Sequence, residues 1–185
     1  MKITQVLDTV WEIDNFFPDF QQIKESYRSN NTPWTSQYPN RLLTPWDQPC
    51  AVNDLVKEYC STITDIVQQP LQPQVSYASL DLGGSQIMMH RLHPDIRCFV
   101  QVCMADQEQP ELATNFCIDA EMNSNYPQDY ESFRVFKPEQ VQAVSYRPNT
   151  AYVFLNHPRK FMGTANPVPT NMIRETINLH FALAI

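Results

Sequence analysis

Residues 149–168 read NTAYVFLNHPRKFMGTANPV, and residues 174–183 read RETINLHFAL. The first stretch contains a continuous apolar run at 151–156, and the second alternates apolar and polar residues at 176–183. Short runs of these two kinds are typical of β-strands. Five further runs of the same kind follow Pro70, at 75–80, 86–92, 98–105, 114–118 and 141–146. Seven or more strands at short spacing predict a sandwich or a barrel.

The part of the chain before these strands has helical periodicity in two places. At 14–28, aromatic and aliphatic residues recur at three-to-four spacing behind Pro18. At 52–67 a second such pattern follows Asn53, a residue type that caps helices. Because each predicted helix has one apolar face, we expect both helices to pack on the outside of one sheet.

Between the two predicted helices, residues 29–49 are rich in Asn, Pro, Thr and Trp and have no period. We expect an irregular segment there, held to the core by Trp34 and Trp46. The length of 185 residues suits one domain. We therefore expect a helical part at 1–70 that packs on a β-barrel core at 71–185.

Charge and cysteine content exclude several classes of protein. Thirteen Lys and Arg against 20 Asp and Glu give a net charge of −7, and the largest basic cluster is the pair Arg159-Lys160, so nucleic acid and anionic membranes are not expected partners. The five cysteines form an odd set without a Cys-x-x-Cys pair, so we expect reduced, mostly buried thiols. The N-terminal residues show no secretory pattern, which predicts a cytoplasmic protein.

Histidines are the first candidates for chemistry in such a fold. The sequence has four of them: His90, His93, His157 and His180. His93-Pro94-Asp95 matches the His-x-Asp pair that forms, with one distant histidine, the facial triad for non-haem Fe(II). The alternative is a turn in which Asp95 accepts backbone hydrogen bonds. His180 lies in an alternating run, which predicts a core or barrel-lining residue without a catalytic role.

The two C-terminal stretches resemble the end of the Fe(II)/2-oxoglutarate dioxygenases. In that superfamily a strand ending in Phe-x-Asn precedes a histidine-glycine pair and then Pro-Val, and an Arg-x-Ser/Thr motif on the last core strand binds the C5 carboxylate of 2-oxoglutarate. Arg174 and Thr176 match the last motif. A guanidinium and a hydroxyl two residues apart point from one strand face, so they can hold one carboxylate together. The alternative is that Arg174 pairs with an acidic neighbour.

Other parts of the chain resemble short oxygenase-like proteins of this superfamily, some of them encoded by bacteriophages and cyanobacteria. Residues 14–20 are similar to their N-terminal helix entry, residues 84–104 to the strand that bears the first ligands, and residues 109–116 to their Leu-Gly-Thr-x-Phe strand. The resemblance covers nearly the whole chain. It implies a double-stranded β-helix (jelly-roll) barrel with flanking helices, with Fe(II) and 2-oxoglutarate as cofactors.

The resemblance is incomplete where the third iron ligand belongs. In place of the histidine-glycine pair this chain has Met162-Gly163, and a thioether is a poor ligand for ferrous iron. The first pair of ligands is uncertain too. By distance to the following strand, His90 takes the first ligand position and Leu92 the place of the aspartate, so that two of the three ligands are lost.

In the other register His93 and Asp95 survive as ligands, and His157 replaces the missing histidine. An active hydroxylase would then bind Fe(II) through these three residues and 2-oxoglutarate through Arg174 and Thr176.

We favour the hypothesis that the protein is a non-catalytic descendant of these oxygenases, which binds neither cofactor. It would act as a binding or assembly module, with a small molecule or a protein as its partner, and would be a monomer or a homo-oligomer. Apolar side chains at former ligand positions suit a packed pocket, because isolated ligands there would be unsatisfied polar groups. A virion or other structural subunit on the same barrel is the third hypothesis. The polar and aromatic segment 119–138 predicts a loop over one mouth of the barrel, where this superfamily sets its specificity.

Overall fold

The computed structural model describes residues 1–29, 32–45, 47, 49–87, 89–90, 92–117, 138–157, 159–164 and 166–184. The first part of the chain contains β1 (Lys2–Leu7), β2 (Val10–Asp14), α1 (Phe20–Arg28), β3 (Thr35–Tyr38), β4 (Arg41–Leu43), α2 (Leu55–Glu58) and α3 (Cys60–Val67). The second part contains β5 (Leu71–Asp81), β6 (Cys98–Cys103), β7 (Thr114–Cys117), β8 (Val141–Val144), β9 (Thr150–Leu155), β10 (Phe161–Thr164) and β11 (Arg174–Leu183). Short 3-10 turns lie at Pro110–Leu112 and Pro138–Gln140.

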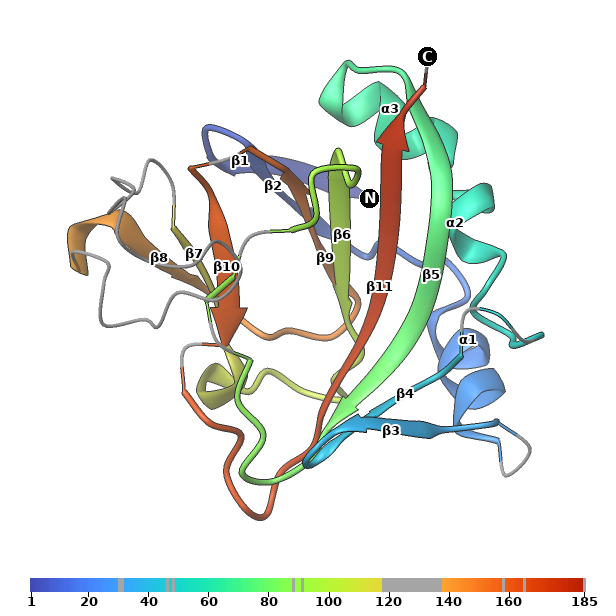
Figure 1. The fold of residues 1–185 in the computed structure, drawn as a ribbon, viewed down its shortest axis with the longest axis vertical. Coiled ribbons are helices and arrows are strands. Elements are labelled where there is room, and N and C mark those ends of the chain that lie inside the picture. The colour runs from blue at the N-terminus through green and yellow to red at the C-terminus, as the bar shows by residue number, and fades with distance from the viewer. Residues whose placement is uncertain are drawn as a thin grey trace.

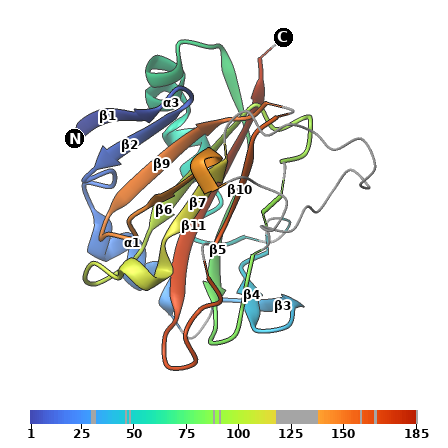
Figure 2. The same cartoon turned by 90° about the vertical axis from the view of Figure 1, so that its left-hand side faces the viewer.

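The strands form two antiparallel sheets (Figure 1). The larger sheet has the order β1-β2-β9-β6-β11-β5-β4-β3, and the smaller has the order β10-β7-β8. The helices lie along one face of the larger sheet, and the smaller sheet stands opposite its other face (Figures 1 and 2). A bridge between His90 and Met162 adds one residue before β6 to the edge of β10. The arrangement is a double-stranded β-helix whose two sheets are not closed into one barrel.

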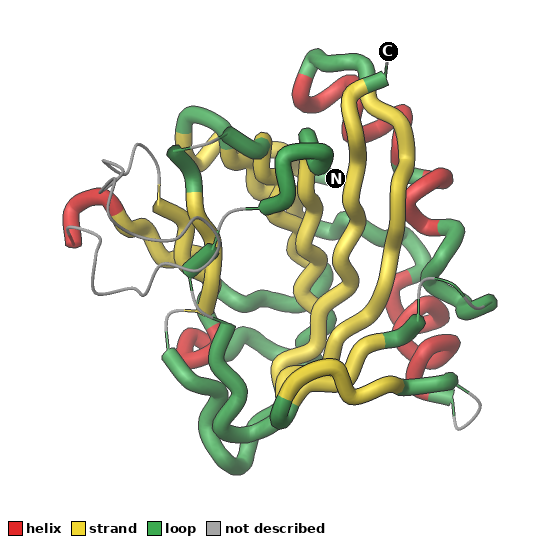
Figure 3. Tube along the Cα trace, in the orientation of Figure 1, coloured by secondary structure: helices red, strands yellow, loops and turns green. Residues whose placement is uncertain are grey.

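Two apolar clusters lie on opposite faces of the larger sheet. Figure 3 shows the helices on one side of this sheet and the smaller sheet on the other. The first joins the helices to the sheet and includes Leu55, Ile63 and Ile177. The second lies between the two sheets and includes Phe99 and Phe154. Helical and strand residues share the first cluster, so the helices pack against one face of the larger sheet.

The first part of the chain contains more strand than the sequence predicted. Helix α1 begins at Phe20 rather than at residue 14, because the residues before it are paired elsewhere. Strand β2 lies between β1 and β9. The backbone N–H of Phe16 donates to the carbonyl oxygen of Asn149 at 3.1 Å, and the backbone N–H of Phe17 donates to Oδ1 of the Asn149 side chain at 2.9 Å. The second predicted helix is divided at Tyr59 into α2 and α3.

Six of the seven predicted strands are present with small changes at their ends, as β5, β6, β7, β8, β9 and β11. The run at 86–92 forms the single bridge at His90 and no extended strand among its described residues. Strand β10, which the sequence did not predict, pairs with β7. Residues 119–137 of the predicted loop at 119–138 lie outside the described residues, and so does Trp46.

The five cysteines are free thiols; Cys98, Cys103 and Cys117 are buried, and Cys50 and Cys60 are half-buried. Desolvation raises the pKa of Cys103 to about 12, which makes a reactive thiolate unfavourable there. No helix in the described part of the chain is long and apolar enough to cross a membrane.

Candidate functional site

The face of β11 that looks toward the smaller sheet is polar. Strand alternation places Arg174, Thr176, Asn178 and His180 on this face, while Ile177 and its apolar neighbours enter the outer cluster. Arg174, Thr176 and Asn178 are each 1% exposed. Buried polar groups need internal partners, so their hydrogen bonds decide what the site can bind.

The Arg174 guanidinium is held on several sides by groups of the same chain. Its Nε donates to the carbonyl oxygen of Leu112 at 3.1 Å, and one terminal nitrogen donates to the Asp81 carboxylate at 3.1 Å. The other terminal nitrogen donates to Gln101 Oε1 at 2.8 Å and to Thr114 Oγ1 at 2.6 Å. Thr114 Oγ1 in turn donates to Gln101 Oε1 at 2.7 Å. The nitrogens of the Arg174 guanidinium that would bind a bidentate carboxylate therefore already have hydrogen-bond partners within the chain.

The Thr176 hydroxyl also has hydrogen-bond partners within the chain. It lies 2.7 Å from Ser79 Oγ and accepts a hydrogen bond from Asn178 Nδ2 at 3.1 Å. The sequence motif is thus present on the expected face, but both members of the motif face polar groups of neighbouring strands.

Asp81 is the acidic neighbour of Arg174, and it serves two guanidinium groups. Arg41, Asp81 and Arg174 are direct cross-strand partners on β4, β5 and β11, so they lie in one row across the sheet. The Arg41 Nε lies 3.0 Å from Asp81 Oδ1, in the geometry of an ion pair rather than of an aligned hydrogen bond. The Asp81 side chain is fully buried. One buried carboxylate thus compensates two positive charges.

The bridge beside β10 brings together two of the positions that the resemblance assigns to iron ligands. The backbones of His90 and Met162 exchange hydrogen bonds of 2.9 and 3.0 Å, so these two residues are direct neighbours. Both residues line a cavity of about 100 Å³ together with Leu92 and Arg174. This placement matches the register in which His90, Leu92 and Met162 occupy the three ligand positions.

The alternative ligands lie elsewhere. The side chains of His93 and Asp95 are 69% and 78% exposed and contact each other at 3.4 Å. The backbone N–H of Asp95 donates to His93 Nδ1, and that of Arg159 donates to Nδ1 of the exposed His157. Each of these histidines therefore has a local turn contact of its own. In the described part of the chain, no three His, Cys, Asp or Glu side chains are grouped so that they could hold a metal ion.

Neither set of residues fits a ferrous ion. The three positions that the resemblance assigns to iron ligands carry one imidazole, one isobutyl group and one thioether, and although His180 also lines the small cavity, no carboxylate lines it among the described residues. Non-haem Fe(II) is held by two imidazoles and a carboxylate. The residues present do not fit 2-oxoglutarate either, because the Arg174 guanidinium is already bonded to Asp81.

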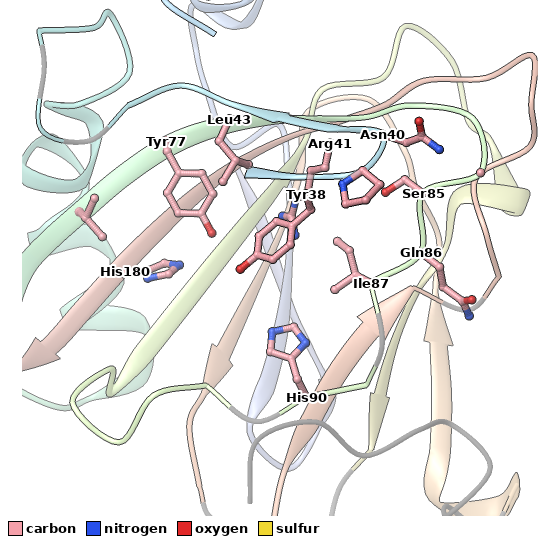
Figure 4. Close-up of a pocket in the computed structure, with 13 residues that line it drawn as sticks. Tyr38, Asn40, Arg41, Leu43, Tyr77, Ser85, Gln86, Ile87, His90 and His180 are labelled. Carbon is pink, nitrogen blue, oxygen red and sulfur yellow. The ribbon is translucent and has the colours of Figure 1, made fainter. Parts of the chain in front are cut away.

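A larger cavity of about 750 Å³ shares part of its wall with the small one. Tyr38, Arg41, Tyr77, His90 and His180 point into it from different elements (Figure 4). His180 packs edge-on against the ring of Tyr77, and its buried Nε2 has no hydrogen-bond partner among the described residues. Desolvation, with a smaller contribution from His90, lowers the pKa of His180 to about 4, so its imidazole is neutral at pH 7.

No protein-family model matches the sequence, and no curated protein matches it. Solved structures do match. HygX from Streptomyces hygroscopicus, solved with nickel, 2-oxoglutarate and hygromycin B bound, superposes with a TM-score of 0.64 at 14% identity, over 96% of this chain and 84% of its own. The chain has the fold of the Fe(II)/2-oxoglutarate oxygenases.

Two further oxygenase structures support this assignment of the fold. AviO1 from Streptomyces viridochromogenes has a TM-score of 0.62 at 15% identity, over 95% of this chain and 90% of its own. A prolyl-4-hydroxylase from Pseudomonas putida has a TM-score of 0.59 at 10% identity, over 96% of this chain and 94% of its own. At such identities the likeness shows the fold and does not carry the activity with it.

Sequence reasoning missed Arg41, Asp81 and Gln101 as members of the site. Arg41 lies in the segment that was expected to be irregular, and nothing in the sequence gives its register. One signal was available for Asp81: Tyr77, Ser79 and Asp81 alternate with apolar residues on β5, as the polar residues of β11 do. Polar residues that alternate in the same way on two paired strands indicate one polar face of the sheet.

Proposed function

We propose that this protein is a catalytically degenerate relative of the 2-oxoglutarate/Fe(II) oxygenases that acts as a binding module. The observation that carries the proposal is the Asp81–Arg174 pair. The chain's own carboxylate binds the guanidinium that the sequence resemblance assigns to the C5 carboxylate of 2-oxoglutarate. A free 2-oxoglutarate would have to displace Asp81 and leave that carboxylate buried with a weaker partner, which costs several kcal/mol.

The ligand positions support the same function. Leu92 and Met162 are apolar, and both pack against the cluster between the sheets. Apolar side chains at these two positions add no unpaired ligand atom to a metal-free site, in agreement with the rule that buried polar groups are hydrogen-bonded. The larger cavity remains open beside it, and its volume of about 750 Å³ lies within the range of small-molecule sites.

An anaerobic titration with Fe(II) or Mn(II), followed by an assay for succinate from 2-oxoglutarate, tests the proposal. We expect no stoichiometric metal binding and no turnover by the wild type. The double variant Leu92→Asp/Met162→His should bind metal at least about tenfold more tightly, because it places two imidazoles and a carboxylate at the three assigned ligand positions. Met162→His alone is the matched control and should change metal affinity little, because the carboxylate ligand would still be missing.

Two other outcomes would change the assignment. Tight stoichiometric binding by the wild type that His157→Ala abolishes would establish an active site built from His93, Asp95 and His157, and thus an oxygenase. A single large assembly in sedimentation would favour the structural-subunit hypothesis over a small-molecule module.

A further inference from the structure

The walls of the two adjoining cavities carry positive charge without a facing carboxylate. Among the described residues that line them, Arg41 and Arg174 are the charged ones, and no Asp or Glu is present. Asp81 lies behind this wall and is shared between both guanidiniums. Counted over the described residues, the region therefore holds one uncompensated positive charge, in a protein whose net charge is −7.

Arg41 carries this surplus charge where a ligand can reach it. Arg174 is 1% exposed and has hydrogen-bond partners on both terminal nitrogens. The side chain of Arg41 is 18% exposed, and its contact with Asp81 is an ion pair through Nε. Figure 4 shows Arg41 beside Tyr38 in the wall of the larger cavity. A charged group that is mostly withdrawn from water and incompletely paired is a favourable contact for an anion.

The rest of the larger cavity suits an apolar or aromatic body. Leu43, Val75 and Ile87 supply aliphatic surface, and Tyr38 and Tyr77 supply aromatic surface. The buried Nε2 of His180 has no partner among the described residues, and Figure 4 shows the imidazole directed into this space. A neutral imidazole nitrogen that is buried and unpaired indicates a position where a ligand atom can complete a hydrogen bond.

We infer that the larger cavity binds a small monocarboxylate with an apolar or aromatic body, and that Arg41 is the residue that contacts its carboxylate. This inference rests on the proposed function, since it takes the cavity to be a binding site without iron. A carboxylate matches the planar guanidinium fork, and a single negative charge matches the single surplus positive charge. A dianion such as 2-oxoglutarate or phosphate would leave one negative charge uncompensated in a partly desolvated site.

Calorimetric and thermal-shift titrations with matched probes test the inference. The probes are benzoate, phenylacetate and 3-phenylpropionate, each compared with its neutral amide of the same shape. We expect at least one acid to bind with a Kd on the order of 1 mM, as befits a ligand of this size, and to raise the Tm with concentration. Its amide should bind about tenfold more weakly or worse. This comparison uses the wild-type protein and does not depend on any variant.

Variants then locate the contact. Arg41→Gln should weaken binding of the acid about tenfold and leave binding of the amide unchanged, and Arg41→Lys should have an intermediate effect because it keeps the charge and loses the fork. Arg174 still pairs with Asp81 in these variants, which favours folding. Lys57→Gln is the charge-matched control, because Lys57 is exposed on α2 and does not line the cavity. It should change binding of the acid less than about twofold.

The inference is overturned if none of the three acids binds at about 10 mM, a concentration well above the expected Kd. It is also overturned if acid and amide bind equally, or if Arg41→Gln and Lys57→Gln behave alike. These failures differ from a failure of the proposed function. Metal binding with 2-oxoglutarate turnover overturns the proposed function whatever benzoate does, whereas absent metal binding together with absent acid binding overturns only this inference.

Discussion

Replacing Asp81 with asparagine removes the carboxylate that, in the described part of the chain, compensates both Arg41 and Arg174. The Asp81 and Arg174 side chains are 0% and 1% exposed, so water does not screen the charge that is left behind. Removing one partner of a buried ion pair typically costs about 3–5 kcal/mol. A chain of 185 residues loses about 2–4 °C in Tm per kcal/mol, so we expect the Tm to fall by about 6–20 °C.

Urea unfolding and thermal unfolding, followed by circular dichroism, measure this loss. Asp54→Asn is the matched control. It makes the same change of charge in an exposed pair with Lys57, in which both side chains are more than 70% exposed, and it should cost less than about 0.5 kcal/mol. The double variant Asp81→Leu/Arg174→Met should recover much of the loss, because replacing both partners leaves no unpaired charge.

A cost below about 1 kcal/mol for Asp81→Asn would refute this reasoning, because the pair would then not be a desolvated one. A second variant, Asp81→Ala, frees both space and the Arg174 guanidinium. Acetate or formate should restore part of its stability by taking the place of the missing carboxylate. If neither anion does so, Asp81 does not occupy a carboxylate-binding position.

Three further predictions concern other buried groups. The pKa of His180 is lowered from 6.5 to about 4, so between these pH values the unfolded state binds a proton that the folded state does not bind. The free energy of unfolding should therefore fall by up to about 3 kcal/mol as the pH drops from 6.5 to 4. In urea titrations His180→Phe should reduce this dependence of the unfolding free energy on pH, and an unchanged dependence would assign it to other groups. Gly83→Ala should destabilise the protein by about 1–3 kcal/mol, because a Cβ there would lie 2.6 Å from backbone atoms of Thr170; a Tm equal to that of the wild type would contradict the close approach. Iodoacetamide at pH 8 should alkylate the half-buried Cys50 well before the buried Cys103 in the native protein, and mass spectrometry of the peptides would reveal the opposite order if burial were misjudged.

The sequence predicted most of the second half of the fold because its strands are half-buried or fully buried and have a clear pattern. Strand β1 was missed because it lies at an edge and four of its six residues are exposed, so it has no apolar alternation. Strand β10 was missed because it has only four residues, all buried, and contains Gly163. Patterns of this kind do not distinguish a short strand from a loop.

For the candidate site, the sequence predicted which side chains of β11 share a face, but it did not predict the residues with which they form hydrogen bonds. The two-residue spacing of Arg174 and Thr176 correctly placed both side chains on one face. Their binding partners depend on the register between β11 and β5, which pairs Arg174 with Asp81. Register arises from tertiary packing, and local sequence does not specify it across a sequence separation of 93 residues.

The carboxylate of Asp81 differs from any diffusing acid in one respect: it belongs to the same folded chain as the guanidinium that it binds. An intramolecular partner acts at a fixed effective concentration, whereas a metabolite acts in proportion to its supply. Under the proposed function, the interior between the two sheets is therefore held together to the same degree at any concentration of 2-oxoglutarate. Occupancy of the larger cavity by another ligand can then vary without changing how that interior is assembled.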